Sequence, residues 1–178
     1  TQRDLTVSGI SVSDKTYDST TSATVSVTGI SYSGLVVGDN FSVAATGVFN
    51  NEHVGTQTVT LTETPSGTDV ENYNITYQGS SSVDISAKAI TITGITVNDK
   101  TYDSTTDASF LNTIISTDGG YIADDSLTFT GTATFADEHV GNNIAVSFSG
   151  ISYAGDDVNN YTITDQAGTT ADITQRDL

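Results

Sequence analysis

Two lysines stand at the same place in two copies of one motif, Asp-Lys-Thr-Tyr-Asp, at Lys15 and Lys100. A lysine buried deeply enough to lose its proton can form an intramolecular isopeptide bond with an Asn side chain. This reaction needs a carboxylic acid held neutral by apolar surroundings. The alternative is a charged lysine that pairs with Asp18 or Asp103, or that lies over a Tyr ring. We expect the ion pair, and keep the isopeptide bond as the second hypothesis.

Two histidines also recur in register, within Glu-His-Val-Gly at His53 and His139. A metal site needs several converging ligands, usually supported by further hydrogen bonds. Each histidine has one adjacent Glu and no second His in its copy. We therefore expect both to serve a turn or packing role, and we expect no metal site and no cofactor.

Paired carboxylates lie in segments predicted as loops, and they could offer oxygen ligands to Ca²⁺. The pairs are Asp69 with Glu71, Asp124 with Asp125, and Asp156 with Asp157. None follows the Asp-x-Asp-x-Asp-Gly spacing of a calcium loop, so solvated loop charge is the expected role. Weak Ca²⁺ binding is the alternative.

Catalysis is not expected. The chain has no nucleophile elbow, phosphate-binding loop or metal-binding motif. Aromatic residues also recur in register, and in a chain without Cys we expect them in the core or at strand corners. They are Tyr17 with Tyr102, Tyr73 with Tyr161, and Phe49 with Phe135.

The chain of 178 residues is strongly acidic, with a formal net charge of −17. That charge repels nucleic acid and anionic membrane surfaces and favours a monomer. Cys is absent, so disulfides cannot hold the fold. No apolar stretch reaches membrane-spanning length.

The elements that must position these residues come from an internal repeat. Tyr17 matches Tyr102 at a spacing of 85 residues, Phe49 matches Phe135 at 86, and Tyr73 matches Tyr161 at 88. Three residues are therefore inserted in the second copy. We expect them in loops, because a one-residue slip turns a strand over. Thr1–Leu5 returns as Thr174–Leu178, which predicts the start of a third copy in a longer array.

Each copy is predicted to be all-β, with short alternating strands between turns rich in Asp, Asn, Ser and Gly. The strands expected in the first copy are Leu5–Val12, Ala23–Thr28, Phe41–Phe49, Thr56–Thr62, Tyr73–Tyr77 and Ser82–Ser86. An immunoglobulin-like β-sandwich is the first choice for each module. A β-grasp-like module with one short helix, at Phe110–Ser116, is the alternative.

The predicted domains are 1–85, 86–173 and the opening of a third repeat at 174–178. Val83–Ile95 crosses the first boundary with strand-like alternation and no Gly, Ser or Pro hinge. A last strand that passes almost directly into the next first strand would make a stiff joint. We expect two modules end to end in an elongated rod.

The ordered blocks Lys-Thr-Tyr-Asp-Ser-Thr-Thr, Phe-x-x-Glu-His-Val-Gly, Asp-Val-x-Asn-Tyr and Val/Ala-Asp-Ile resemble the YDG repeat over nearly the whole chain, twice. The family's usual Tyr-Asp-Gly is Tyr-Asp-Ser here, with Ser19 and Ser104 at a place where Gly would accept positive φ more easily. The resemblance implies an extracellular repeat of large bacterial adhesins, including filamentous-haemagglutinin-like proteins. It implies no catalytic activity.

The expected function is that of stalk or spacer repeats of a secreted or cell-surface bacterial adhesin, whose partners are neighbouring repeats of the same chain. The alternative is a weak binder of glycan or host protein made effective by multivalency. Its hint is the divergence between the loops Gly29–Asn40 and Gly119–Asp125. A third hypothesis is self-association in a biofilm through exposed sheet edges, which the charge opposes.

Overall fold

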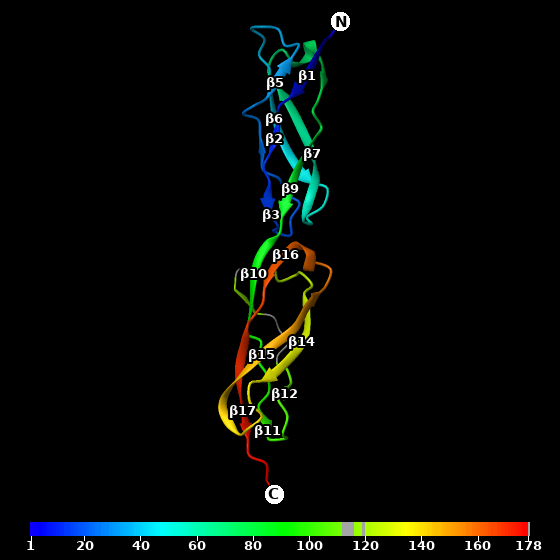
Figure 1. Cartoon of the computed structure of the whole chain (residues 1–178). Coiled ribbons are helices and arrows are strands. Elements are labelled where there is room, and N and C mark those ends of the chain that lie inside the picture. The colour runs from blue at the N-terminus through cyan, green and yellow to red at the C-terminus, as the bar shows by residue number, and fades with distance from the viewer. Residues whose placement is uncertain (112–115, 119, 178) are drawn as a thin grey trace. The chain divides into compact units, whose positions relative to one another are not determined.

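The computed structural model describes residues 1–111, 116–118 and 120–177, and the side chains of 116–118 are left aside (Figure 1). The contacts between residues divide the chain into two compact units, Thr1–Ser86 and Ala87–Leu178. This boundary falls one residue after the predicted one. The predicted all-β class is confirmed, because both units consist of strands.

Nine strands make up unit 1, with a single 3-10 turn, η1, at Val70–Asn72. They are β1 (Arg3–Ser8), β2 (Ser11–Val12), β3 (Lys15–Thr16), β4 (Val25–Ser26), β5 (Ser31–Ser33), β6 (Ser42–Phe49), β7 (Gly55–Ser66), β8 (Tyr73–Thr76) and β9 (Ser80–Ser86). They form the sheets β5-β1-β8, β3-β9-β7-β6 and β2-β4. The pairs β1–β8 and β3–β9 are parallel, and the others are antiparallel.

Unit 2 repeats this plan, with the 3-10 turn η2 at Val158–Asn160. Its described strands are β10 (Lys88–Thr93), β11 (Lys100–Thr101), β12 (Asp107–Ala108), β13 (Ser116–Asp118), β14 (Thr128–Phe135), β15 (Gly141–Ala154), β16 (Tyr161–Thr164) and β17 (Gly168–Thr174). Its sheets are β13-β10-β16 and β11-β17-β15-β14-β12. The parallel pairs are β10–β16 and β11–β17.

The core of each unit comes from the alternation of inward apolar and outward polar residues along the strands. In β1, Leu5 and Val7 are buried while their neighbours are exposed. Among the predicted core aromatics, Tyr17, Phe49, Tyr73, Phe135 and Tyr161 are buried and Tyr102 is half-buried. The prediction that these aromatics form core or corner residues is therefore confirmed: five are buried, and Tyr102 packs half-buried against the core of unit 2.

The predicted strand Leu5–Val12 is wrong in one respect, because it is broken into β1 and β2. The break falls at Gly9, whose φ is +79°. A side chain there would run into the carbonyl of Gly29, so the turn needs glycine. Two segments between the predicted strands, 13–22 and the loop Gly29–Asn40, contain the short strands β3 and β5.

The expectation that the inserted residues lie in loops is also wrong for two of the three. Strand β15 has 14 residues where β7 has 12. The two extra residues are absorbed by register shifts, one between Gly141 and Ile144 against β17 and one opposite Thr130 and Thr132 of β14. A β-bulge accepts one extra residue without turning the rest of the strand over.

The third inserted residue falls between Asp118 and Ile122 in the sequence, because Asp118 corresponds to Ser33 at a spacing of 85 and Ile122 to Val36 at 86. The helical turn proposed at Phe110–Ser116 falls mostly outside the described residues. Within the described ranges, η1 and η2 are the helical segments.

Candidate functional site: the two lysine loops

Lys15 lies in β3, which runs beside the end of β9, the last strand of unit 1. Lys15 is paired with Ile85 and Thr16 with Ser86, both in parallel register with β9. The amide of Tyr17 then donates to the carbonyl of Ser86 at 2.9 Å. The chain turns back at Ser19, in the left-handed region with φ +57°. The turn therefore brings residues 18–22 over the lysine side chain.

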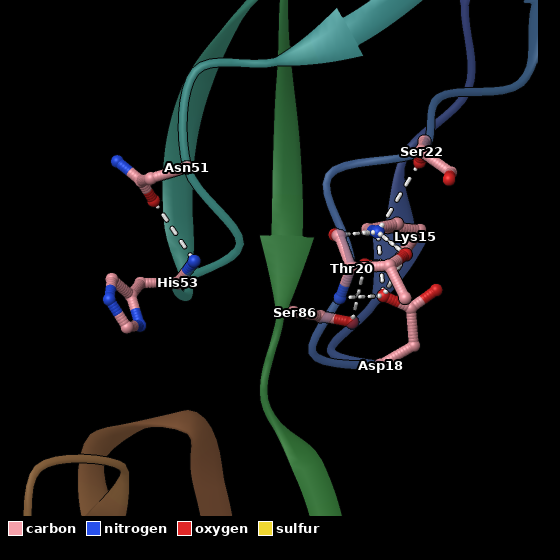
Figure 2. Close-up of polar contacts among 7 residues, drawn as sticks. All are labelled: Lys15, Asp18, Thr20, Ser22, Asn51, His53 and Ser86. Carbon is pink, nitrogen blue, oxygen red and sulfur yellow. Dashed lines mark hydrogen bonds and ion pairs between the residues drawn. The ribbon is translucent and has the colours of Figure 1, made fainter.

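The ammonium group of Lys15 is surrounded by oxygen atoms of this returning loop (Figure 2). Its Nζ donates to Asp18 Oδ1 at 2.6 Å, to the carbonyl of Thr20 at 2.5 Å and to Thr20 Oγ1 at 3.2 Å. The carbonyl of Ser22 lies at 3.3 Å. Asp18 Oδ1 also accepts from the Thr20 amide at 3.0 Å and the Thr20 hydroxyl at 2.9 Å.

Lys100 has the same partners in unit 2. Its Nζ contacts Asp103 Oδ1 at 2.9 Å, the carbonyl of Thr105 at 2.6 Å and the carbonyl of Asp107 at 3.1 Å. Ser104, at the position of Ser19, has φ +60°. We call each assembly, residues 15–22 or 100–107, a lysine loop.

A buried ring lies beneath each ammonium group. Lys15 Nζ is 5.1 Å from the centre of the Phe49 ring, and Lys100 Nζ is 5.5 Å from that of Phe135. These distances allow a cation–π attraction. The ring is therefore a Phe of β6 or β14, and the sequence-based suggestion of a Tyr ring is wrong. The predicted ion pairs with Asp18 and Asp103 are confirmed.

The electrostatics of the two acidic partners agree with charged lysines. The hydrogen bonds from Lys100 and Thr105 lower the pKa of Asp103 to about 2. Burial raises the pKa of Asp18, but hydrogen bonds from Lys15 and Thr20 outweigh it and bring the pKa below its ordinary value. Both carboxylates are therefore ionised at neutral pH, and each loop is closed by an ion pair.

An isopeptide bond requires a neutral amine as nucleophile and a protonated acid beside it. The lysine loops instead hold an ammonium ion against an ionised carboxylate. The isopeptide hypothesis for Lys15 and Lys100 stays a prediction that intact mass tests, since each such bond would remove about 17 Da as ammonia.

The two histidines belong to closed turns. The amide of His53 donates to Asn51 Oδ1 at 2.9 Å and its carbonyl accepts from Gln57 Nε2 at 2.9 Å. The amide of His139 donates to Asp137 Oδ1 at 2.8 Å. Figure 2 shows the imidazole of His53 on the other side of β9 from Lys15. His53 therefore lies outside the lysine loop of its unit.

Members of the acidic pairs have hydrogen-bonding roles. Asp69 Oδ2 accepts from the amide of Asn40 at 2.7 Å, and Asp157 Oδ2 accepts from the amide of Ser126 at 2.8 Å. Asp125 Oδ2 accepts from the hydroxyl of Tyr161 at 2.6 Å. Over the part of the chain that the structure describes, no group of three or more His, Asp or Glu side chains is arranged to hold a metal ion.

A Tyr–Asp hydrogen bond recurs in both units, in loops whose sequences otherwise differ. Tyr73 donates to Asp39 Oδ2 at 2.5 Å and accepts from the amide of Val36 at 3.0 Å. The hydrogen bond to Asp39 and burial raise the pKa of the Tyr73 hydroxyl. In unit 2, Tyr161 makes the same contacts with Asp125 and the amide of Ile122. Asp39 was not singled out from the sequence, although its spacing of 86 residues from Asp125 would have revealed it.

A second group missed by the sequence analysis is a pair of glutamines. Gln78 accepts from the amide of Ile10 at 2.9 Å and donates to its carbonyl at 2.9 Å. Gln166 does the same to Ile95, at 2.9 and 2.8 Å. Each glutamine side-chain amide thus bonds both the amide and the carbonyl of one residue, as the main chain of a neighbouring strand would.

The fold and the lysine loops define a duplicated all-β module in which a partly exposed ion pair closes one loop of each unit. Comparison with known families gives its identity: the YDG domain matches residues 1–81 and again residues 86–171. The chain belongs to the YDG domain family. Searches of curated proteins and of solved structures found no match. In the described ranges, no helix is long and apolar enough to span a membrane.

Proposed function

We propose that the two YDG domains are stalk or spacer repeats of a secreted or cell-surface bacterial adhesin of the filamentous-haemagglutinin-like kind, and that they project a distal binding region. The observation that supports this most is the repetition of one internal framework. Both the lysine loop and the Tyr–Asp contact recur in unit 2 with the same partners. A spacer needs the same fold many times, whereas a recognition site needs particular exposed groups.

The net charge of −17 supports the same proposal. It keeps neighbouring copies of an extended protein apart in solution. The test replaces the YDG repeats of the parent protein with an unrelated rigid repeat of equal length, and measures adhesion at matched surface display. Retained adhesion is expected. Lost adhesion at normal display would overturn the spacer function.

A weak binding function is the second candidate, and one observation favours it. The loop between β5 and β6 carries Val37 at its tip with its side chain fully exposed, beside Val36 at 42% exposure. Exposed apolar side chains that lie next to one another can form part of a contact surface. If this loop binds host protein or glycan, bead-clustered Val37→Ser protein should bind cells less than the parent. Equal binding by both proteins would remove this candidate.

A further inference from the structure

We propose that each YDG domain has a mechanical function: its first and last segments form one parallel seam that resists tension applied along the chain. The seam of unit 1 consists of residues 3–17 against residues 73–86. The inference goes beyond the spacer function and rests on it only for its biological use. Resistance to force is a property of a single unit.

Main-chain pairing forms the two ends of the seam in unit 1. At its start, Arg3 is paired with Tyr73 and Thr6 with Thr76, in parallel register between β1 and β8. At its end, Thr16 is paired with Ser86, again in parallel, between β3 and β9. Partners are 70 residues apart at both ends. The two segments therefore run in the same direction along the whole unit.

Side chains bridge the gap between the two paired stretches. The Gln78 amide holds both main-chain groups of Ile10 at 2.9 Å. Asp14 Oδ1 accepts from the amide of Asp84 at 2.9 Å. Near the start of the seam, Asn74 Nδ2 donates to Asp4 Oδ1 at 2.9 Å. The seam therefore continues where the strands are interrupted.

The same seam is present in unit 2. Lys88 is paired with Tyr161 and Thr101 with Thr174, both in parallel. Gln166 bonds the main chain of Ile95, and Asp99 Oδ1 accepts from the amide of Asp172 at 2.8 Å. The partners are 73 residues apart here, because the three inserted residues lie between the two segments. Their pairing is unchanged.

The direction of loading makes this arrangement strong. Figure 1 shows the start of β1 at one end of unit 1 and the end of β9 at the other. Tension along the chain pulls the first segment toward one end and the last segment toward the other. Because the two segments are parallel, they must slide past each other, and the seam contacts are loaded together. Antiparallel hairpin arms pulled from their open end would instead separate one pair at a time.

The lysine loop lies at the end of the seam where the last segment leaves the unit. Lys15 follows Asp14 and joins β3 to the returning loop through Asp18 and Thr20. Ser86 Oγ also donates to the carbonyl of Lys15 at 3.3 Å. The ion pair therefore fixes β3 to the returning loop, and the contacts of Ser86 hold β3 beside β9, so that β3 is not peeled away first under load.

The test is single-molecule stretching of the full chain in two pulling directions. The chain has no Cys, so each cysteine that is introduced defines one attachment point for a handle. Handles at the two termini load both seams in shear. A handle at the N-terminus and one on Glu71→Cys pull apart residues at the same end of the unit 1 seam and open it pair by pair. We expect a several-fold lower opening force in the second direction. Equal forces would overturn the proposal.

A substitution within the seam gives the second measurement. Gln78→Met removes three hydrogen bonds: the two to the amide and carbonyl of Ile10, and a third from Gln78 Nε2 to the carbonyl of Ser80 at 3.2 Å. At constant force between the termini, we expect one of the two unfolding events to become about tenfold faster. The Gln78→Met, Gln166→Met double variant should accelerate both events.

Gln57→Met is the matched control, because Gln57 donates to the carbonyl of His53 and lies outside the seam. It should leave the unfolding rate under load unchanged. An equal acceleration by Gln57→Met and Gln78→Met would overturn the proposal. The stretching test and the adhesion test have separate outcomes. If the domain unfolds easily under load, but adhesion survives replacement of the repeats, the seam proposal is refuted and the spacer function remains.

Discussion

The lysine loop and the loop that precedes β6 differ in how far the two copies agree. The lysine loop has the same residues from Lys15 to Thr21 as from Lys100 to Thr106, and the same contacts. The loop before β6 shares only its supports, a Tyr hydroxyl and an Asp carboxylate, and carries Val37 where unit 2 has Ala123.

The difference follows from what closes each loop. Side-chain atoms of Lys, Asp and Thr close the lysine loop, so their identities matter. The other loop is held mainly through main-chain amides, such as those of Val36 and Asn40. Main-chain amides are present whatever the side chain, and the tip is therefore free to differ.

The largest expected effect breaks the support beneath one lysine loop. Phe49 is 2% exposed and lies under Lys15. Phe49→Ala should destabilise unit 1 by about 3–5 kcal/mol through loss of core packing. Denaturant unfolding should then show two transitions, with unit 2 unchanged. Val48→Ala, on the same strand but 55% exposed, is the control and should change stability by less than about 0.5 kcal/mol. A single unshifted transition for Phe49→Ala would contradict this packing role.

A smaller effect is expected when the ion pair itself is removed. Lys15→Met keeps most of the side-chain length, but it removes the cation that pairs with Asp18 and the donor to the Thr20 carbonyl. Because the loop is partly exposed, solvent screening limits the expected loss to about 1–2 kcal/mol. Chemical denaturation measures it. Lys88→Met, outside both lysine loops, should lower the free energy of unfolding by less. Equal losses for the two variants would show that the contacts of Lys15 in its loop add no stability.

Acid should open both lysine loops without a substitution. The folded pKa of Asp103, about 2, lies below the value of about 3.9 expected in the unfolded chain. The carboxylate therefore stabilises the fold above pH 4, and this contribution is lost as the pH falls toward 2. The amide resonance of Thr105, which bonds this carboxylate, should shift in that window. The pKa of Asp18 is also lowered, so the amide resonance of Thr20 should shift below the ordinary titration range of an aspartate. A midpoint near pH 4, or one unaffected by Asp103→Asn, would argue against the ion pair.

The smallest effect tests the turn itself, and its sign is opposite. Ser19 has φ +57°, where Gly has no steric penalty. Ser19→Gly should stabilise unit 1 by roughly 0.5 kcal/mol, after the larger entropy of Gly in the unfolded chain is subtracted. Thermal unfolding can detect this gain. Ser11→Gly, within strand β2, should instead destabilise the unit, and a loss at Ser19 would show that the turn relies on the Ser side chain.

The sequence was enough to predict the duplication, the all-β class and the Lys15–Asp18 contact. Repeats and alternation are local patterns, and Lys15 and Asp18 are three residues apart. The seam could not be predicted, because its partners are about 70 residues apart and single-sequence patterns carry no such register. Gln78 was missed for a related reason, since nothing in its neighbourhood shows that its amide bonds Ile10.

The bulges in β15 were missed because a bulge leaves the inward and outward pattern intact on either side. The spacing of the repeats showed how many residues were inserted, and we expected these residues to lie in loops. The pairing of Gly141 with Ile173, and of Ile144 with Ala171, shows where one of the strand insertions went. Insertions within strands can therefore be read from sequence only when the partner strand is known.

The constant pairing of the seam has a consequence for how such repeats can change. All three inserted residues lie between the first and last segments of unit 2, and both segments keep the partners that they have in unit 1. The interior of a domain can therefore grow or shrink while its entry and exit strands stay in step. A family built in this way can diversify by insertion at little risk to the chain as a whole, because each change is contained within one domain.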